Sequence, residues 1–250
     1  MNARGYVICS YPRSGSNYLC QLLSSTDKLG NPQEWFNGVG IRALLKDAQY
    51  PLEPKLQLRE VLNRGSTANG VYGLKMFCAA FDRIARLDWT GALPDLHWIH
   101  LERRDLLGQA ISDVRSTQTR QYRSSSVPLS EPRFDHRAIR HSLFQTACDQ
   151  ARWKVFFARN AIQPLQLVYE DFVLDPQLAV DLVARHVGLQ ESCQITRDNV
   201  TLQIQRDTIS EDWRSRFLSV ERDTTRLDRV ASTTGSMKKA IASGWRLLTS

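Results

Sequence analysis

The feature that most constrains the fold is a short apolar run that ends in a turn and is followed at once by an amphipathic segment. Residues 6–11 are apolar over most of their length, as expected of a buried strand. The turn at residues 12–16 leads into a predicted helix, whose apolar positions are Tyr18, Leu19, Leu22 and Leu23. A loop between a strand and a helix points free backbone N–H groups outward, so phosphate binding is predicted here.

The residues of this loop suit that task. Gly15 permits close approach of a ligand to the backbone, and Arg13 supplies a fixed cation. Further donors to an anion come from the loop and the first helical turn, namely Ser14, Ser16, Asn17 and Tyr18. The segment is not a Walker A loop, because the spacing G-x-x-x-x-G-K-[ST] and its lysine are missing. An ordinary turn with a helix start remains the alternative.

Strands and helices are predicted to alternate along the rest of the chain. Further strands are expected at residues 70–77, 96–101 and 165–169, with helices at 81–87, 105–113, 136–160 and 177–187. Such alternation predicts an α/β fold with a mainly parallel sheet. A single domain is expected over residues 1–230, with a polar, mobile substrate loop at 115–135 and a poorly ordered tail at 231–250.

Two further groups of residues follow predicted strands. Arg104 ends the third strand and Ser112 lies two turns into the next helix, so the pair could hold one phosphate from two sides. The segment Tyr169-Glu170-Asp171-Phe172 closes the fourth strand at the carboxyl edge, where open α/β sheets bind ligands. The alternative for Arg104 and Ser112 is that their spacing arises by chance. The alternative for the segment from Tyr169 to Phe172 is that its polar residues cap the next element.

Composition narrows the class of partner. The net charge of +7 and the excess of arginine over lysine favour an anionic ligand, because guanidinium groups match phosphate oxygens bidentately. The basic residues are scattered, which argues against nucleic acid. No apolar run is long enough to span a membrane and no signal-like segment is seen, so a cytoplasmic location is expected. The five cysteines are predicted to be reduced core thiols, and no metal-ligand spacing occurs among them.

The three groups, in this order, resemble the sulfotransferase superfamily that uses 3′-phosphoadenosine-5′-phosphosulfate (PAPS). Within it the chain is most similar to the bacterial trehalose 2-sulfotransferase-like group, a group of carbohydrate sulfotransferases. The similarity rests on Pro32-Gln33-Glu34-Trp35-Phe36, Gly73-Leu74-Lys75 and Arg103-Arg104-Asp105, and covers about residues 5–217. It implies a P-loop-like parallel sheet flanked by helices, with a helical and loop insertion on the acceptor side.

The resemblance also implies roles for particular residues. The loop from Arg13 to Tyr18 would hold the 5′-phosphosulfate, and Arg104 with Ser112 would hold the 3′-phosphate. Glu34 would be the general base, because sulfuryl transfer to an alcohol requires removal of the hydroxyl proton. Lys75 is a candidate for the sulfate or acceptor side, or for a structural ion pair. Arg206 is a candidate nucleotide contact near the C-terminus.

The implied co-substrate is PAPS, without a metal, and the implied acceptor is a saccharide or glycolipid such as trehalose. The resemblance is looser at residues 115–122, which leaves the identity of the acceptor open. A homodimer is a further open expectation. None of the histidines matches the histidine base of the superfamily members that sulfonate phenols and steroids. Two other readings remain: a P-loop kinase of small metabolites, opposed by the missing Walker lysine, and a non-catalytic nucleotide or nucleic-acid binding module.

Overall fold

The computed structural model describes residues 3–122, 127–201, 208–225 and 227. The chain divides into two units, residues 1–214 and 215–250. The sheet, the helices up to α8 and the candidate site described below all belong to the first unit. The second unit begins inside the last described helix, α9 (Thr208–Glu221).

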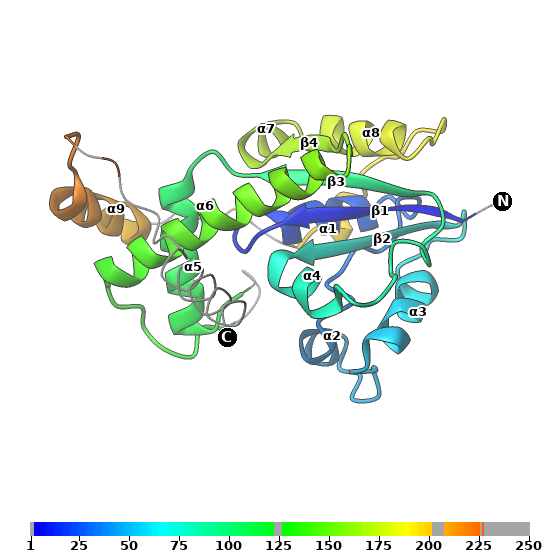
Figure 1. The fold of residues 1–250 in the computed structure, drawn as a ribbon, viewed down its shortest axis with the longest axis horizontal. Coiled ribbons are helices and arrows are strands. Elements are labelled where there is room, and N and C mark those ends of the chain that lie inside the picture. Colours follow the sequence, from blue (N-terminus) through cyan, green and yellow to red (C-terminus); the bar gives the residue numbers. More distant parts are fainter. Residues whose placement is uncertain (1–2, 123–126, 202–207, 226, 228–250) are drawn as a thin grey trace, which may run out of the picture. The chain divides into compact units, whose positions relative to one another are not determined.

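A four-stranded parallel sheet forms the centre of the first unit (Figure 1). Its strands are β1 (Arg4–Ser10), β2 (Val71–Phe77), β3 (Leu96–Glu102) and β4 (Leu165–Val168). The spatial order is β2-β1-β3-β4, and Ile8 of β1 stands between Lys75 of β2 and Ile99 of β3. The predicted α/β fold with a parallel sheet is therefore confirmed. The connection from β2 to β3 crosses β1, which creates a switch in strand order beside β1, where ligands of open α/β sheets bind.

Helices connect and cover the strands. They are α1 (Ser16–Ser24), α2 (Gly38–Leu45), α3 (Pro54–Arg64), α4 (Cys78–Ile84), α5 (Leu106–Thr119), α6 (His136–Arg159), α7 (Tyr169–Leu174), α8 (Pro176–His186) and a 3₁₀ turn, Arg197–Asn199. Several begin at a polar side chain that accepts a hydrogen bond from the first turn, which fixes where the helix starts. These capping residues are Asn37, Glu53, Asp105, Asp135 and Asp175.

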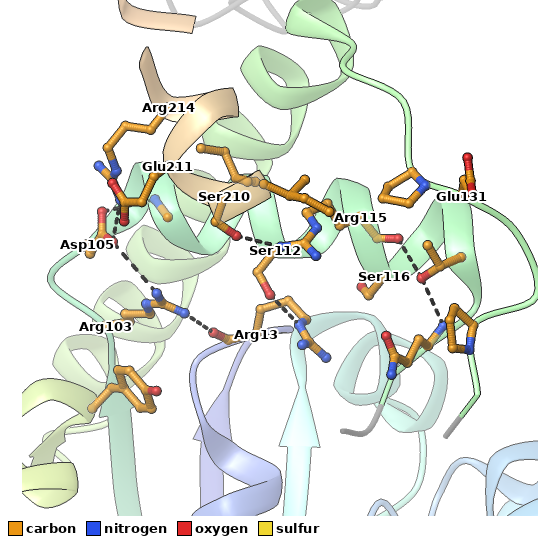
Figure 2. Close-up of a pocket in the computed structure, with 18 of the residues that line it drawn as sticks. Arg13, Arg103, Asp105, Ser112, Arg115, Ser116, Glu131, Ser210, Glu211 and Arg214 are labelled. Atoms are coloured by element: carbon orange, nitrogen blue, oxygen red, sulfur yellow. Dashed lines mark hydrogen bonds and ion pairs between the residues drawn. The ribbon is translucent and has the colours of Figure 1, made fainter. Parts of the chain in front are cut away.

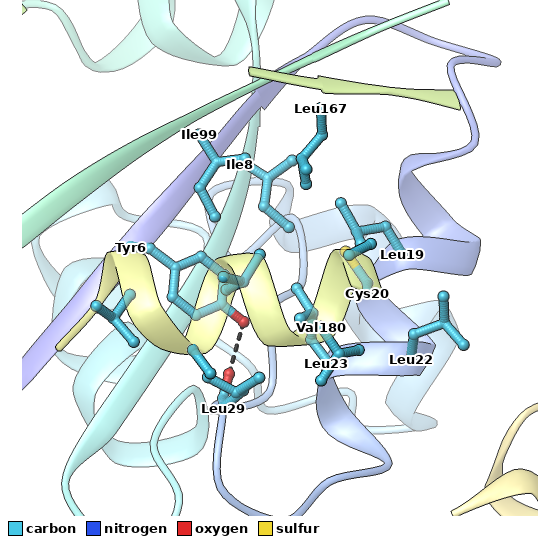
Figure 3. Packing of buried hydrophobic residues seen from close by; sticks show 14 of the residues in the cluster. Tyr6, Ile8, Leu19, Cys20, Leu22, Leu23, Leu29, Ile99, Leu167 and Val180 are labelled. Atoms are coloured by element: carbon cyan, nitrogen blue, oxygen red, sulfur yellow. Dashed lines mark hydrogen bonds between the residues drawn. The ribbon is translucent and has the colours of Figure 1, made fainter. Parts of the chain in front are cut away.

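Two apolar cores lie on opposite faces of the sheet, because alternate residues of β1 point to opposite sides. Tyr6 and Ile8 pack with α1 and α8, as Figure 3 shows, and the Tyr6 hydroxyl donates to the Leu29 carbonyl at 2.5 Å. Val7 and Cys9 pack with residues of α4 and α6 on the other face, in a core rich in aromatic rings. The strand and its loop are thus held from both sides.

Three predicted elements differ from the structure by more than one residue or change type. The helix expected at residues 81–87 is α4, which begins and ends three residues earlier. Helix α5 continues to Thr119, so the polar segment expected to start at residue 115 begins five residues later. Ser116 and Thr119 donate their hydroxyl protons to the carbonyls of Asp113 and Arg115, which lets polar residues remain helical and buried. Tyr169, expected to close β4, instead begins α7, where Glu170 and Asp171 suit the first turn.

All five cysteines are free, and four of them are buried as expected for core thiols, whereas Cys148 is only partly buried. No helix within the described ranges is long and apolar enough to cross a membrane. Arg206, residues 123–126 of the predicted substrate loop, and the tail at 231–250 lie outside the described residues.

Candidate functional site

A cavity of about 630 Å³ lies at the carboxyl edge of the sheet. Its inner wall is formed by segments that follow three strands: Arg13 after β1, Arg103 after β3, and Tyr169 after β4 (Figure 2). Helix α5 contributes a second wall that includes Ser112 and Arg115. The volume falls within the roughly 300–1,000 Å³ typical of small-molecule sites. The edge predicted from the strand order is therefore where the structure has a ligand-sized space.

The loop after β1 has the backbone geometry of an anion site. Arg13 and Gly15 both have positive φ values, 61° and 83°, so the chain turns sharply before α1 begins. Gly15 is the N-cap of α1 and offers no side-chain hydrogen bond to the first helical turn. A Cβ at Gly15 would overlap the ring of Tyr169. Glycine is therefore required here both by the backbone conformation and by the close packing of Tyr169.

Three predicted loop residues contribute in different ways. The Ser14 side chain is fully buried, and its hydroxyl oxygen has no hydrogen-bond partner within the described part of the chain. Ser16 is buried in the first turn of α1, and Tyr18 stacks on Phe172 with ring centroids 6.0 Å apart. A buried hydroxyl without a partner is costly, and Ser14 is not one of the described residues that line the cavity, so its role as a donor to an anion stays a prediction.

Arg13 is a half-buried cation with neutral partners. Its Nε donates to the Ser112 hydroxyl at 2.8 Å, and its Nη1 donates to the Tyr122 carbonyl at 2.9 Å. Burial is the main cause that lowers the pKa of the Arg13 guanidinium, and the carboxylate of Asp113 opposes that shift. The positive charges of Arg103 and Arg115 act in the same direction as burial. Cations gathered in this way are stabilised by an anion between them.

Arg103 forms the floor beside this loop. Its guanidinium lies over the Tyr169 ring, 4.9 Å from the centroid, and its Nη1 donates to the Arg13 carbonyl at 3.2 Å. The Glu170 carboxylate accepts hydrogen bonds from the backbone N–H groups of Arg104 and Asp105, at 3.0 and 3.2 Å. The first turn of α7 thereby fixes the loop that follows β3, and so fixes Arg103.

The outer wall is formed by the start of α9. The Arg115 guanidinium donates to the Ser210 hydroxyl at 2.5 Å, and Arg214 donates to Asp105 at 2.6 Å (Figure 2). Burial alone would raise the pKa of Asp105, but the hydrogen bonds from Arg214 and from the Gly108 N–H lower it overall. Asp105 is therefore negatively charged, and its ion pair with Arg214 connects the start of α9 to the loop that follows β3.

Glu34 and Lys75 form a separate group beside the same loop. The Lys75 ammonium is buried and lies 2.8 Å from Glu34 Oε1, and it also donates to Asn17 Oδ1 at 2.5 Å. Because Asn17 lies in the first turn of α1, Lys75 connects the proposed base to the predicted donor loop. The structural ion pair considered for Lys75 is present. It does not exclude a role near the sulfate, because its partner is the candidate base.

The structure does not pair Arg104 with Ser112. Arg104 is exposed, and its guanidinium forms a two-pronged ion pair with Asp171 at 2.7 and 2.5 Å. Among the described residues, Arg103 and Ser112 line the cavity and Arg104 does not. Two neighbouring arginines at the end of β3 thus have different surroundings, which a spacing in the sequence cannot distinguish.

Sequence reasoning missed Arg103, Arg115 and Arg214 as members of the site. In the sequence, Arg103 belongs to a family motif without a role of its own, and the pattern predicts a loop at Arg115, which the structure has on α5. Their common signal is the excess of arginine, but position in space is needed to select them. Over the described ranges no group of three His, Cys, Asp or Glu side chains is arranged to hold a metal ion.

A parallel sheet with a glycine-containing loop and an arginine-lined cavity at its carboxyl edge defines an α/β protein built to hold anionic ligands. Residues 5–219 match the model of the family described as Stf0 sulphotransferase, so the chain belongs to that family. The predicted family is thus confirmed.

The curated relatives include two trehalose 2-sulfotransferases. The one from Mycolicibacterium smegmatis is 24% identical over 254 residues, covering 85% of this chain and 93% of the relative. The one from Mycobacterium tuberculosis is 28% identical over 210 residues, covering 66% of this chain and 77% of the relative. A crystal structure of a sulfotransferase from Alicyclobacillus acidocaldarius aligns with 90% of this chain and 98% of its own, at 14% identity and a TM-score of 0.43.

Proposed function

We propose that this sulfotransferase moves a sulfuryl group from PAPS to a hydroxyl of a saccharide or glycolipid, with Glu34 as the general base. The observation that carries the proposal is the half-buried Arg13 cation, which has neutral partners and lies beside two further cavity arginines. A donor with several phosphate and sulfate oxygens would neutralise this group of charges.

The donor loop fits a phosphosulfate. The backbone N–H groups at the start of α1, the Ser14 hydroxyl and the Arg13 guanidinium can donate to its oxygens. Ser112 and the cavity arginines are the proposed donors to a second phosphate. Negative charge that develops on sulfate and bridging oxygens can be stabilised by these fixed donors, so the reaction has no need of a metal in this scheme.

In the proposed transfer step, one bond to sulfur forms while another breaks. The acceptor hydroxyl oxygen forms a bond to sulfur while its proton passes to the Glu34 carboxylate. The bond between sulfur and the bridging oxygen breaks, and its electron pair stays on the 5′-phosphate of the leaving 3′-phosphoadenosine 5′-phosphate. The Lys75 ammonium contacts both Glu34 and Asn17. It can therefore stabilise negative charge on the base and at the start of the donor loop helix.

Trehalose is the first acceptor to test, because it is the sugar named for the two curated relatives. Arg104 remains a proposed contact for the 3′-phosphate on the basis of the resemblance, and Arg103 is the competing candidate from the cavity. Arg206 remains a proposed nucleotide contact. A cytoplasmic location and a homodimer also remain proposals.

Isothermal titration with 3′-phosphoadenosine 5′-phosphate tests the donor assignment. We expect binding that needs no metal, and no comparable binding of adenosine triphosphate with magnesium. Preference for the triphosphate with magnesium would favour a kinase, and binding of neither nucleotide would contradict the proposal. Incubation with PAPS and trehalose, followed by mass spectrometry for sulfated sugar, then tests the acceptor.

A further inference from the structure

The segment that carries Glu34 is held rigidly against the sheet. Gln33 pairs with Leu74 in an isolated parallel bridge, and the Lys75 N–H donates to the Gln33 carbonyl at 2.9 Å. The next two residues, Trp35 and Phe36, are both buried, and the Trp35 indole N–H donates to the Gly73 carbonyl at 3.1 Å. The backbone at Glu34 is therefore fixed relative to β2 on both sides.

The side chain of Glu34 is held at both carboxylate oxygens. Lys75 Nζ lies 2.8 Å from Oε1, and the side-chain amide of Asn37 donates to Oε2 at 3.0 Å. A carboxylate held at one oxygen can still rotate about its last bond. Donors on separate oxygens remove that freedom, and both favour the negatively charged form.

The orientation of the Asn37 amide is itself determined by the fold. Asn37 is the N-cap of α2, and its Oδ1 accepts a hydrogen bond from the Gly40 N–H at 3.2 Å. With the oxygen used for the cap, the nitrogen is the atom that faces Glu34. A Cβ at Gly40 would crowd the Asn37 amide, with Nδ2 2.5 Å and Cγ 2.8 Å away, so the glycine leaves room for this arrangement.

We propose that Asn37 is a positioning residue, which uses the start of α2 to orient the Glu34 carboxylate for proton transfer. The proposal rests on the proposed function in naming Glu34 as the base. Lys75 holds the other oxygen and contacts Asn17 of the donor loop helix at 2.5 Å. The orientation of the base and the position of the donor loop are thus connected through one ammonium group.

The experiment follows the Glu34 carboxyl directly, by NMR of protein labelled with ¹³C at glutamate carboxyl carbons. The Glu34 signal is assigned from its loss in Glu34→Gln, and the pH at which it takes up its proton is compared among variants. Asn37→Ser keeps a capping oxygen but removes the amide donor. We expect the midpoint for Glu34 to rise by about 1 pH unit, because a hydrogen bond to the charged form is lost.

Gly40→Ala is the second variant, since it crowds the Asn37 amide without removing it. We expect a rise in the same direction, smaller than that of Asn37→Ser. The control is Asp175→Ser, which places the same residue at the N-cap of α8, where the native side chain accepts from the Leu178 N–H at 3.0 Å, and which also removes one negative charge. It should leave the Glu34 midpoint unchanged.

The outcomes separate this proposal from the proposed function. An unchanged midpoint in both Asn37→Ser and Gly40→Ala would overturn the positioning role. An equal rise in Asp175→Ser would also overturn it, because the effect would then come from loss of any helix cap. Titration of the same variants with 3′-phosphoadenosine 5′-phosphate reports on the donor site separately, and its failure in the unaltered protein would contradict the proposed function instead.

Discussion

Two cations at the carboxyl side of the sheet are balanced in opposite ways. Lys75 is buried with 2% of its side chain exposed, and it is compensated by the Glu34 carboxylate and the Asn17 amide oxygen. Arg13 has a hydroxyl and a carbonyl as hydrogen-bond partners, and the Asp113 carboxylate near it is opposed by the positive charges of Arg103 and Arg115. The free energy of holding a charge away from water is thus offset inside the protein for Lys75. For Arg13, the proposed anionic ligand would supply further compensation.

The comparison separates two tasks between two neighbouring groups of residues, since among the described residues Arg13 lines the cavity and Glu34 and Lys75 do not. In the proposed mechanism, Lys75 belongs with the base, where a ligand of high charge is not required. Arg13 belongs with the proposed donor, whose oxygens would complete its coordination. Variants that remove one member of each group should therefore affect different measurements, turnover in the first case and nucleotide affinity in the second.

The largest effect is expected when the carboxylate is removed from the ion pair of Glu34 and Lys75. Glu34→Gln should lower turnover by roughly 10²- to 10⁴-fold, the usual contribution of a general base. Affinity for 3′-phosphoadenosine 5′-phosphate, measured by isothermal titration, should stay nearly unchanged because the donor loop is intact. Unchanged turnover with PAPS and an established acceptor would remove the assignment of Glu34 as the base.

A smaller effect is expected when the Arg13 cation is removed. Arg13→Ala should weaken binding of 3′-phosphoadenosine 5′-phosphate by about 10- to 100-fold, the range for loss of a charge-assisted hydrogen bond. Arg185→Ala, which removes an exposed arginine of α8, is the matched control for net charge and should bind normally. Equal losses in both variants would mean that overall charge, and not the site, determines affinity.

The smallest effect concerns the two neighbouring arginines at the end of β3. We expect Arg103→Ala to reduce the preference for 3′-phosphoadenosine 5′-phosphate over adenosine monophosphate by about tenfold, because Arg103 lines the cavity with Ser112. Arg104→Ala should change this preference less, since its guanidinium is exposed and paired with Asp171. The opposite result, measured by titration of both ligands, would support the assignment of the 3′-phosphate to Arg104 made from the sequence.

The parts of the fold that local sequence determines were predicted well. The apolar run at β1, the turn around Gly15 and the periodicity of α1 are each contained within a few residues, so pattern alone identifies them. The parallel sheet follows from the alternation of strands and helices. The end of α5 was missed because Ser116 and Thr119 favour loops in isolation, whereas here their hydroxyls bond to the helix backbone.

The site was predicted less completely because it depends on contacts between distant segments. The sequence could propose Glu34 and Lys75 separately, but only the fold shows their ion pair. Likewise, the choice between Arg103 and Arg104 depends on Tyr169 and Asp171, which belong to a segment far along the chain. Spacing identifies residue types that suit phosphate, and tertiary structure decides which of them face the ligand.

The contacts of Glu170 have a consequence for how the protein is made. Its carboxylate holds the backbone N–H groups of residues that are 66 and 65 positions earlier in the chain. During synthesis, β1 and the start of α5 leave the ribosome well before β4 and Glu170 are available. The loop after β3 therefore lacks its anchor until most of the first unit has been translated, and closing so long a loop is slow. A nascent chain that ends before Glu170 lacks the residue that fixes the loop after β3, and so lacks the anchor of Arg103.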